Sequence, residues 1–393
     1  MYSFEKHIGS CIRVAKRETK RLFSNKIYVF CIFIVPLFSL FFFLSLMHEG
    51  LPADLPLALV DLDNSPSSRN LARQLDAFEG TQIVLRTSDF SKARENMQQG
   101  KIYGILLIPD NFSKDAVSGK QPKLSFYTNN SYLIAGSLLF KDLKTVSVLA
   151  SAAVGLQTGR AKGYTDNQIT TQIQPILIDT HLIGNPWLNY SVYLNNVILP
   201  GILQLMIFCV TVYSIGIEIK EHSKRKWLRA GDYSILTSLV GKLLPQTILF
   251  LISGLVIYVA LYGMMGFPFN GSIFSMLLLL FLFVISSQAF GVLMIGILPT
   301  LRLGLSFACI WGMISFSISG FSFPVNAMYP FVQAVSNLFP LRHYFLIYVD
   351  QALNGRGMLY SWEHYIALAA FLILPVLVLK PLKFAMRHVK YEL

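Results

Sequence analysis

Long uncharged stretches separated by short basic ones dominate the second half of the chain. Lys242 is followed by no charged residue until Arg302, and Arg302 by none until Arg342. A helix of about 20 apolar residues crosses the hydrocarbon core of a bilayer, whereas a water-soluble domain needs no apolar tract of this length. The pattern therefore predicts a membrane protein. We expect six spans, at 27–47, 197–219, 243–264, 273–298, 303–323 and 365–379.

A different periodicity precedes the first span. In residues 1–26, a mostly apolar stripe recurs at steps of three and four residues, and basic side chains fill the positions between. The stripe is Phe4, Ile8, Ile12, Ala15, Thr19 and Leu22, and the bases are Arg13, Lys16, Arg17, Lys20 and Arg21. This spacing predicts an amphipathic helix lying in the inner membrane interface. The alternative is a basic flank that only fixes topology, and the regular spacing favours the helix.

Between the first two spans, residues 48–190 alternate strand and helix signals. Strands are predicted at 57–60, 82–85, 102–108 and 123–127, and helices at 65–78, 91–99, 109–118 and 132–160. Repeated β-α-β units indicate a mostly parallel sheet covered by helices. The fold class is thus an α-helical polytopic membrane bundle of about six spans with an inserted α/β domain. The remaining five spans form a membrane domain over 191–393.

The distribution of charge gives the orientation. Only 14% of the residues are charged, and the net charge is +12. The pieces 1–26, 220–242, 299–302 and 380–393 hold 18 Lys/Arg and, with Glu218 at the membrane edge, six acids, a surplus equal to the whole net charge. Because basic loops stay in the cytoplasm, we expect both termini inside and the α/β domain outside a cell membrane. The charge is then a topology signal and a contact with anionic membrane lipids, so no nucleic acid partner is expected.

Few motifs of enzyme chemistry are present. The four cysteines lie in the N-terminal helix and in spans, so the exported domain has no disulfide, and their spacing suggests no metal site. Asp61 and Asp63 follow the first strand, but Asp-x-Asp-Asn-Ser-Pro is also turn and capping chemistry, and we interpret it as structural. The sequence lacks the phosphate-loop pattern G-x-x-x-x-G-K-[ST] and shows no catalytic constellation. We predict a non-enzyme without catalytic residues, metal or cofactor of its own.

The cytoplasmic loop 218–242 carries more than topology requires. A topogenic loop needs bases, but this one also has Glu218, Glu221 and a Trp227-Leu228 pair beside Lys226. On a helix continuing from the second span, the two glutamates share a face. Trp227 and Leu228 would form an apolar knob for a groove on a cytoplasmic partner. Alternatively, Trp227 anchors the loop in the headgroup layer.

The stretch after the fifth span is apolar but interrupted. Residues 324–345 contain Pro324, Pro330 and Pro340, which break a straight helix. A re-entrant segment packed on the outer side of the bundle fits this pattern, and an apolar interfacial loop is the alternative. The residues that we single out here are Gly320, Phe323, Pro324 and Met328.

Six blocks occur in an order that is specific although each is weak alone. They are Val60-Asp-Leu-Asp-Asn-Ser-Pro-Ser-Ser-Arg, Gly100-Lys-Ile-Tyr-Gly-Ile-Leu-Leu-Ile-Pro-Asp-Asn-Phe, Asn185-Pro-Trp-Leu-Asn-Tyr, Leu199-Pro-Gly, Gly241-Lys-x-x-Pro and Ser319-Gly-x-x-Phe-Pro-x-x-x-Met. Together they resemble, nearly end to end, the permeases of the type-two ABC exporter family with a large exported domain between the first two spans. One departure is that the family's arginine-glutamate-x-glycine-threonine block is absent, and Glu218-x-x-Glu221 with Lys226-Trp-Leu stands in its place.

The resemblance implies an exporter that works with a second permease copy or paralogue and a separate ABC ATPase, which binds ATP and magnesium. A periplasmic adaptor is a further partner that this architecture allows. ATPase closure would push the 218–242 loops, and spans two and five would move around a lipophilic substrate. Candidate lining residues are Gln204, Thr211, Tyr213, Ser315, Phe316 and Ser319. The alternative for each of them is helix–helix packing.

A second class of function fits the same architecture. A non-transporting membrane scaffold or secretion component, whose outer domain binds a partner, would also place a sheet domain on a six-span anchor. Co-purification of an ATPase subunit, with ATP hydrolysis by the complex, separates the two.

Overall fold

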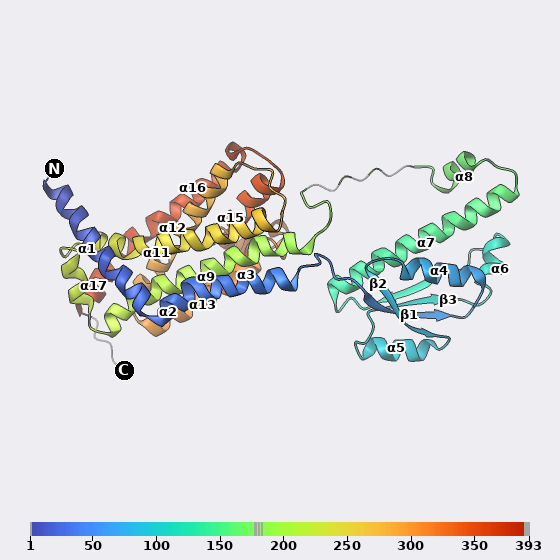
Figure 1. Ribbon diagram of the computed structural model, residues 1–393, viewed down its shortest axis with the longest axis horizontal. Coiled ribbons are helices and arrows are strands. Elements are labelled where there is room, and N and C mark those ends of the chain that lie inside the picture. Colours follow the sequence, from blue (N-terminus) through green and yellow to red (C-terminus); the bar gives the residue numbers. More distant parts are fainter. Residues whose placement is uncertain (1, 177–178, 180, 182–183, 389–393) are drawn as a thin grey trace. The chain divides into compact units, whose positions relative to one another are not determined.

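The computed structural model describes residues 2–176, 179, 181 and 184–388, and it contains two compact units. One is Glu49–His181, the α/β unit; the other joins Met1–His48 to Leu182–Leu393 and is the membrane unit. The first holds the sheet, and the second is helical (Figure 1). The predicted helical bundle with an inserted α/β domain is confirmed.

A four-stranded sheet forms the centre of the α/β unit. Its strands are β1 (Leu55–Asp61), β2 (Thr81–Thr87), β3 (Gly104–Ile108) and β4 (Ser125–Thr128), in the order β2-β1-β3-β4. β1 pairs in parallel with β2 and β3, and β4 runs antiparallel to β3. The mostly parallel sheet expected from the β-α-β pattern is therefore present.

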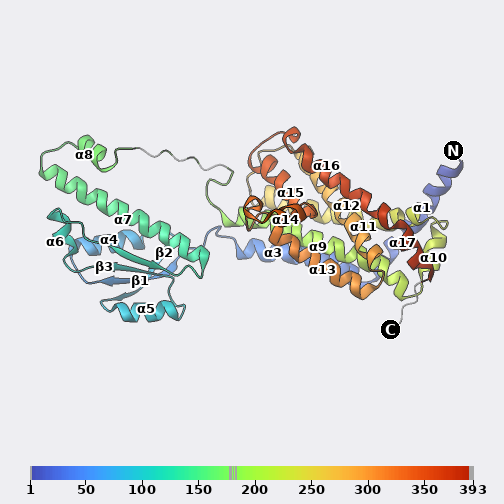
Figure 2. The ribbon, with the colours of Figure 1, turned by 180° about the vertical axis from the view of Figure 1, so that it is seen from behind.

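Helices cover both faces of this sheet. In both ribbon views α4 (Pro66–Asp76) and α7 (Leu133–Ala161) lie on one face and α5 (Phe90–Gln98) on the other (Figures 1 and 2). The alternation along β1 explains this, because Leu57 and Leu59 join the core under α4 and α7, whereas Ala58 and Val60 join the core with α5. Two short helices complete the unit, α6 (Phe112–Val117) and α8 (Asp166–Ile173).

The turn after β1 is built as the sequence suggests. One carboxylate oxygen of Asp61 accepts from the backbone of Asp63 and Asn64, and the other accepts from the Ser68 hydroxyl at 2.7 Å. Ser65 caps α4 by accepting from the Ser68 amide. The oxygens of Asp61 are thus used by its own turn, and in the described residues no group of three or more metal-ligating side chains occurs. The turn and capping contacts that the sequence predicts for Asp61 and Ser65 are therefore present.

Six helical segments of the membrane unit are long and apolar enough to cross a bilayer, counted over the described residues. Three of them are single helices: α9 (Tyr190–Lys220), α12 (Ile273–Ile297) and α13 (Leu301–Ile318). The first span, Lys26–Leu46, consists of α2 (Lys26–Val29), a π-turn (Phe30–Ile34) and α3 (Val35–Leu46), and the third, Ile235–Met264, consists of α11 (Ile235–Tyr258) and a π-turn (Val259–Met264). The last, Met358–Arg387, consists of a 3₁₀ turn (Met358–Ser361), α16 (Trp362–Ala370), a second 3₁₀ turn (Phe371–Ile373) and most of α17 (Leu374–His388).

Spans two and three begin earlier than their apolar stretches predict. The second starts at Tyr190 rather than 197, and the third at Ile235 rather than 243. The reason is that both helices continue through polar side chains whose partners lie in the same helix or in a neighbouring one. Asn195 donates to Ser191, Asn196 donates to the Val192 carbonyl, and Lys242 lies among carboxylates. Hydrophobicity alone therefore placed both boundaries too late.

The segment after α13 consists of short helical pieces. They are a 3₁₀ turn Val325–Ala327, α14 (Pro330–Ser336), α15 (Pro340–Tyr348) and a π-turn Val349–Leu353. Pro330 and Pro340 each open a helix at its first position, where a missing N–H costs nothing. On α15, Leu341, Tyr344 and Ile347 are buried in the bundle core. The breaks expected at the prolines are present, whereas Tyr329 and Phe331, just before and in α14, are 84% and 78% exposed, and the re-entrant path stays a prediction.

The N-terminal helix α1 (Tyr2–Ser24) packs against the bundle along part of its length. Val14 and Leu22 are buried, and Val14 belongs to the same apolar core as Leu239 of α11. Gly241 on α11 lets the backbones approach, because a Cβ at this position would lie 2.7 Å from the Cys11 carbonyl oxygen. The predicted amphipathic helix therefore exists, and one of its faces contacts protein rather than lipid. Figure 2 shows α1, α10 (Lys224–Ala230) and α17 at one end of the unit, which we call the α1 end.

Candidate functional site

Four helices meet at the α1 end around one carboxylate. Glu218, near the end of α9, has no exposed side-chain surface. Arg17 of α1 donates to it at 2.9 Å, and Arg21, one turn further on, donates at 2.8 Å. The Ser223 hydroxyl, just before α10, also donates to it. A buried carboxylate needs such partners, because an unpaired charge in a protein interior is strongly destabilising.

A lysine from α11 completes the arrangement. The Lys242 ammonium donates to Glu18 of α1 at 2.7 Å and to Glu218 of α9 at 3.0 Å, and all three side chains are fully buried. Lys242 therefore ties α11 to both neighbouring helices. Together with the more exposed Arg17, Arg21 and Glu221, these side chains form a set of three cations and three carboxylates with no net charge. We call it the buried charge cluster: Arg17, Glu18, Arg21, Glu218, Glu221 and Lys242.

Arg21 joins both predicted coupling glutamates. Its two terminal nitrogens lie 2.8 Å from Glu218 and 2.5 Å from Glu221. Burial lowers the pKa of this guanidinium, but the carboxylate of Glu218 and its neighbours raise it more, so the pKa lies above its ordinary value. The two glutamates share one helix face, as the three-residue spacing predicts, and that face contacts α1.

The structure places Trp227 in the core. Its indole is 0% exposed, its N–H donates to the Ser238 carbonyl at 3.2 Å, and the Lys242 ammonium lies 5.1 Å from the ring centre. Leu228 is also buried and belongs to the same apolar cluster as Val14 of α1. Trp227 and Leu228 are therefore neither an exposed apolar knob nor an anchor in the headgroup layer, and both expectations are wrong. The reason is that α10 folds back, so that these two side chains pack against α1 and α11. The coupling role of the loop itself stays a prediction.

The opposite face of α10 is basic and open. Arg225, Lys226 and Arg229 are exposed, and Tyr233, just beyond the helix, is 55% exposed. Of the five predicted coupling residues, Lys226 and Glu221 thus reach the surface, whereas Glu218, Trp227 and Leu228 hold α10 against the bundle. A partner that docks on α10 would meet positive charge, directly above the buried charge cluster.

Comparison with known proteins agrees with this architecture. The family model described as "ABC-2 family transporter protein" matches residues 26–379, which is nearly the whole chain. The chain belongs to this ABC-2 transporter family. Membrane subunits of this family are transport components that imply an ABC ATPase partner, and this ABC-2 permease carries no phosphate-loop motif in its sequence.

Two kinds of curated relative are similar to this permease. The "Linearmycin resistance permease protein LnrN" of Bacillus subtilis is 33% identical over 109 residues, which is 28% of each chain. The "Inner membrane transport permease YhhJ" of Escherichia coli is 22% identical over 323 residues, covering 80% of this chain and 81% of the relative. The protein of the same name from Shigella flexneri matches to the same extent.

Four of the candidate pathway residues of this permease lie in contacts within one helix or between two helices. Phe316 fills the space over Gly201, where a Cβ would overlap the ring. The hydroxyls of Ser315 and Ser319 donate to carbonyls of their own helix. Thr211 is fully buried and packs against Gly291 of α12, but its hydroxyl has no hydrogen-bond partner among the described residues. Close approach over small residues is typical of membrane helix pairs, so packing accounts for these positions.

Gln204 and Tyr213 differ from the other candidates. Gln204 is fully buried on α9, and neither end of its amide has a hydrogen-bond partner among the described residues. The Tyr213 hydroxyl accepts from the Asn25 amide at 3.3 Å, and its ring stands edge-on to Tyr28 at 5.2 Å. Tyr213 therefore faces the junction of α1 with the first span, whereas Gln204 is an unsatisfied polar group within the bundle.

The residues singled out after α13 shape a turn. Gly320 has φ +105°, a conformation that favours glycine, and the Val325 side chain lies 3.1 Å from where its Cβ would be. Phe323 is 52% exposed, Pro324 precedes the 3₁₀ turn, and the Met328 carbonyl accepts from Gln333 at 2.8 Å. These residues fix the exit from α13, and the transport role of the segment stays a prediction.

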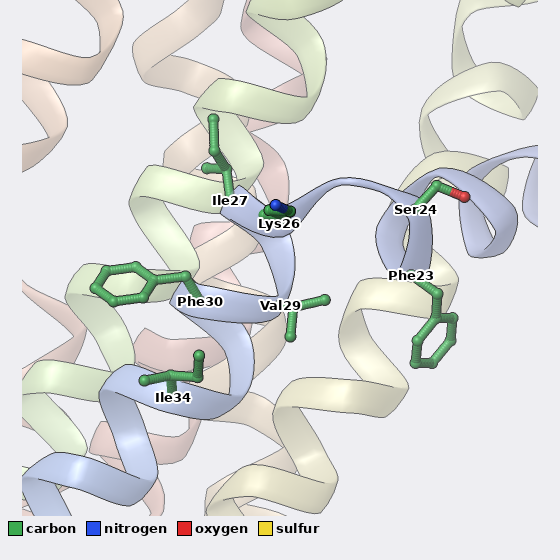
Figure 3. A pocket seen from close by; sticks show the side chains of 7 residues that line it. All are labelled: Phe23, Ser24, Lys26, Ile27, Val29, Phe30 and Ile34. Carbon is green, nitrogen blue, oxygen red and sulfur yellow. The ribbon is translucent and has the colours of Figure 1, made fainter.

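In the described part of the chain, an open groove lies on each of the two units. One, of about 520 Å³, lies at the bend between α1 and the first span (Figure 3); it is lined by Phe23, Ser24, Lys26, Ile27, Val29, Phe30 and Ile34. The other, of about 610 Å³, lies on the α/β unit along α6 and α7, with Phe112, Leu124 and Ala150 among its apolar side chains and Ser147, Ser151 and Thr158 among its hydroxyls.

Sequence reasoning identifies Glu218 and Glu221 but misses the other four residues of the buried charge cluster. It interprets Arg17 and Arg21 as the basic face of the N-terminal helix and Lys242 as a topogenic base, and it does not single out Glu18. A signal was nevertheless present, because Glu18 is the single acid between Lys6 and Lys26. Lys242 likewise stands inside a helical, otherwise apolar run, where a charge needs a partner.

Proposed function

We propose that this chain is the membrane-spanning subunit of an ATP-driven exporter that moves a lipophilic substrate out of the cytoplasm or the inner leaflet. It would act with a second copy or a paralogue, while ATP and magnesium are bound by a separate ATPase subunit. The α1 end would face the cytoplasm of a cell membrane. Membership of the ABC-2 family supports the transport function. A relative named for resistance supports outward direction, because export of a toxic compound confers resistance.

The observation that carries the mechanism is the buried charge cluster beneath α10. Ser223 and Trp227 attach α10 to Glu218 of α9 and to the backbone of α11, while Lys242 joins α11 to α9 and α1. A displacement of α10 by a partner would therefore act on α9, α11 and α1 together rather than on a flexible loop. Paired buried charges resist separation, so the four helices would move as one body.

The remaining features support a lipophilic cargo. The groove of Figure 3 presents Phe23, Ile27, Phe30 and Ile34 at the level where α1 meets the first span, so an amphiphile from the inner leaflet would find an apolar surface there. Within the bundle, Gln204 is the candidate for a polar contact with substrate, because its amide lacks a partner among the described residues. The described spans otherwise offer few charges to a hydrophilic cargo.

The test is charge reversal on the open face of α10. The double variant Lys226→Glu, Arg229→Glu should reduce co-purification of the ATPase at least about tenfold, because like charges across an interface cost several kcal/mol. ATP hydrolysis and export should fall with it at equal membrane abundance. Arg302→Glu, an exposed base at the start of α13, is the matched control and should leave both unchanged.

The outcomes separate the proposals. Full ATPase binding and export by the double variant would show that coupling does not use α10. If the unaltered chain neither retains an ATPase nor supports ATP-dependent export, the exporter proposal is wrong. The scaffold alternative would then be favoured, with the groove along α6 and α7 as the place for its partner.

A further inference from the structure

Two histidines meet at the end of the membrane unit opposite the α1 end. His343 lies on α15, and His364 lies in the first turns of α16, helices that the ribbon views place side by side (Figure 2). Their Nδ1 atoms are 3.4 Å apart, and the ring centres are 5.6 Å apart. His343 is only 4% exposed, whereas His364 is half-buried.

The hydrogen bond made by Nε2 of His343 determines whether its Nδ1 carries a proton or a lone pair. Nε2 lies 2.9 Å from the Asn337 carbonyl oxygen, and a carbonyl can only accept. Nε2 therefore carries the proton, and Nδ1 of the neutral ring directs a lone pair at His364. Donation of the second ring N–H to a backbone carbonyl is also an arrangement that orients metal-ligating histidines.

The distance between the rings can be compared with both possible interactions. Without a metal, the two nitrogens form a long N–H···N hydrogen bond, in which Nδ1–H of His364 donates to the lone pair of His343. Two imidazole nitrogens on one tetrahedral zinc ion, each about 2.0–2.1 Å from the metal, are separated by about 3.3–3.4 Å. The observed 3.4 Å equals this separation, so a metal ion could replace the shared proton with little movement of the two rings.

We propose that His343 and His364 bind one divalent transition-metal ion of the zinc class through their Nδ1 atoms. Imidazole suits Zn²⁺ and Co²⁺ and is a poor ligand for Mg²⁺ or Ca²⁺. In the described part of the chain no third metal-ligating residue forms a cluster with them, so water fills the other positions. The ion joins α15, which belongs to the broken segment after α13, to α16 of the last span. This site does not depend on the proposed transport function.

The other groups around the pair leave the ion site to the two imidazoles. Asp350 is engaged by the Ser361 hydroxyl at 3.1 Å and lies 3.7 Å from Arg356. Arg342, next to His343, donates to the Asn337 side chain at 3.2 Å. The far edge of His343 faces the Phe371 ring, with centres 6.1 Å apart.

The test uses the purified full chain after treatment with a chelator. Zinc binding by competition with a zinc indicator, and the visible absorption of bound Co²⁺, should show one tetrahedral site in the unaltered protein. His343→Gln and His364→Gln should each weaken binding of this ion at least about tenfold, since loss of an outer-shell partner alone has that effect. His48→Gln, an exposed histidine in the loop before the α/β unit, should bind normally.

A second readout guards against misfolding of the buried His343 variant. Zinc should raise the thermal midpoint of the unaltered protein and of His48→Gln but not that of His364→Gln, whose ring is half-buried. Equal zinc binding by the unaltered protein and the double histidine variant would mean adventitious surface binding only and would overturn the site. An octahedral Co²⁺ spectrum unaffected by either variant would do the same.

Discussion

At the scale of single residues, Lys242 is the contact on which the α1 end depends most. It is fully buried and forms the ion pair of Glu18. Glu218, in contrast, also forms ion pairs with Arg17 and Arg21. Lys242→Met would remove this cation and leave Glu18 with the Gln246 amide, which donates to it at 3.4 Å; breaking a buried ion pair in this way costs about 3–5 kcal/mol. We expect a clear fall in the thermal midpoint of the purified chain, measured in detergent.

A double variant distinguishes loss of the pair from loss of packing. Glu18→Met with Lys242→Met removes both charges, and a buried ion pair can often be replaced by apolar side chains at little cost. It should therefore unfold at a higher temperature than Lys242→Met alone. Glu221→Gln, at a position with 53% side-chain exposure, should change stability by less than about 1 kcal/mol. If the double variant is less stable than the single one, the ion pair is not what holds the helices.

At the scale of elements, the close packing of α1 on α11 depends on Gly241. A Cβ there would lie 2.7 Å from the Cys11 carbonyl oxygen and 2.8 Å from the Val14 Cβ, so the helices must separate to accept it. Gly241→Ala should speed hydrogen exchange of the α1 amides and lower the thermal midpoint, although alanine favours a helix by about 1 kcal/mol over glycine. Stabilisation by this substitution would mean that α1 does not need to dock.

The matched control lies on α1 itself. Gly9 has no neighbouring atom within 4 Å of the position that a Cβ would take, so only the helix propensity acts there. Gly9→Ala should leave exchange in α1 unchanged or slower. Opposite effects of the same substitution at Gly9 and Gly241 would then separate docking from helix formation.

Local signals predicted most elements, because the chemistry that defines them is local. Ser65 and Pro66 start α4, and the alternation of Leu57 to Val60 gives β1 two buried faces. The environment of Trp227 was not predictable in this way. It depends on contacts with Ser238 and Lys242 and on the docking of α1, which lies about 200 residues earlier in the chain.

At the scale of the whole molecule, the number of spans is the property that sequence predicts best, and the pairing of charges inside the bundle is the one it predicts least. Six spans follow from apolar length alone. Partner choice for charges inside the bundle depends on tertiary distances, so Glu218 was identified as a coupling residue but not as the buried partner of Lys242. The exposed position of Lys226 and the buried position of Trp227 likewise required the fold.

Orientation can be tested by thiol labelling in a background in which the four native cysteines are replaced by alanine. With the α1 end in the cytoplasm, a membrane-impermeant reagent should label Ser118→Cys and Asn354→Cys in intact cells, since both positions are exposed. Lys226→Cys should react only after permeabilisation; it is preferable to Ser223, whose hydroxyl is bonded to Glu218. The physical reason is the basic surplus at that end, because moving a single Lys or Arg to the bilayer centre costs about 2.5–3.5 kcal/mol. Labelling of Lys226→Cys in intact cells would place α10 outside, where no ATPase could reach it, and would exclude the coupling mechanism together with the orientation.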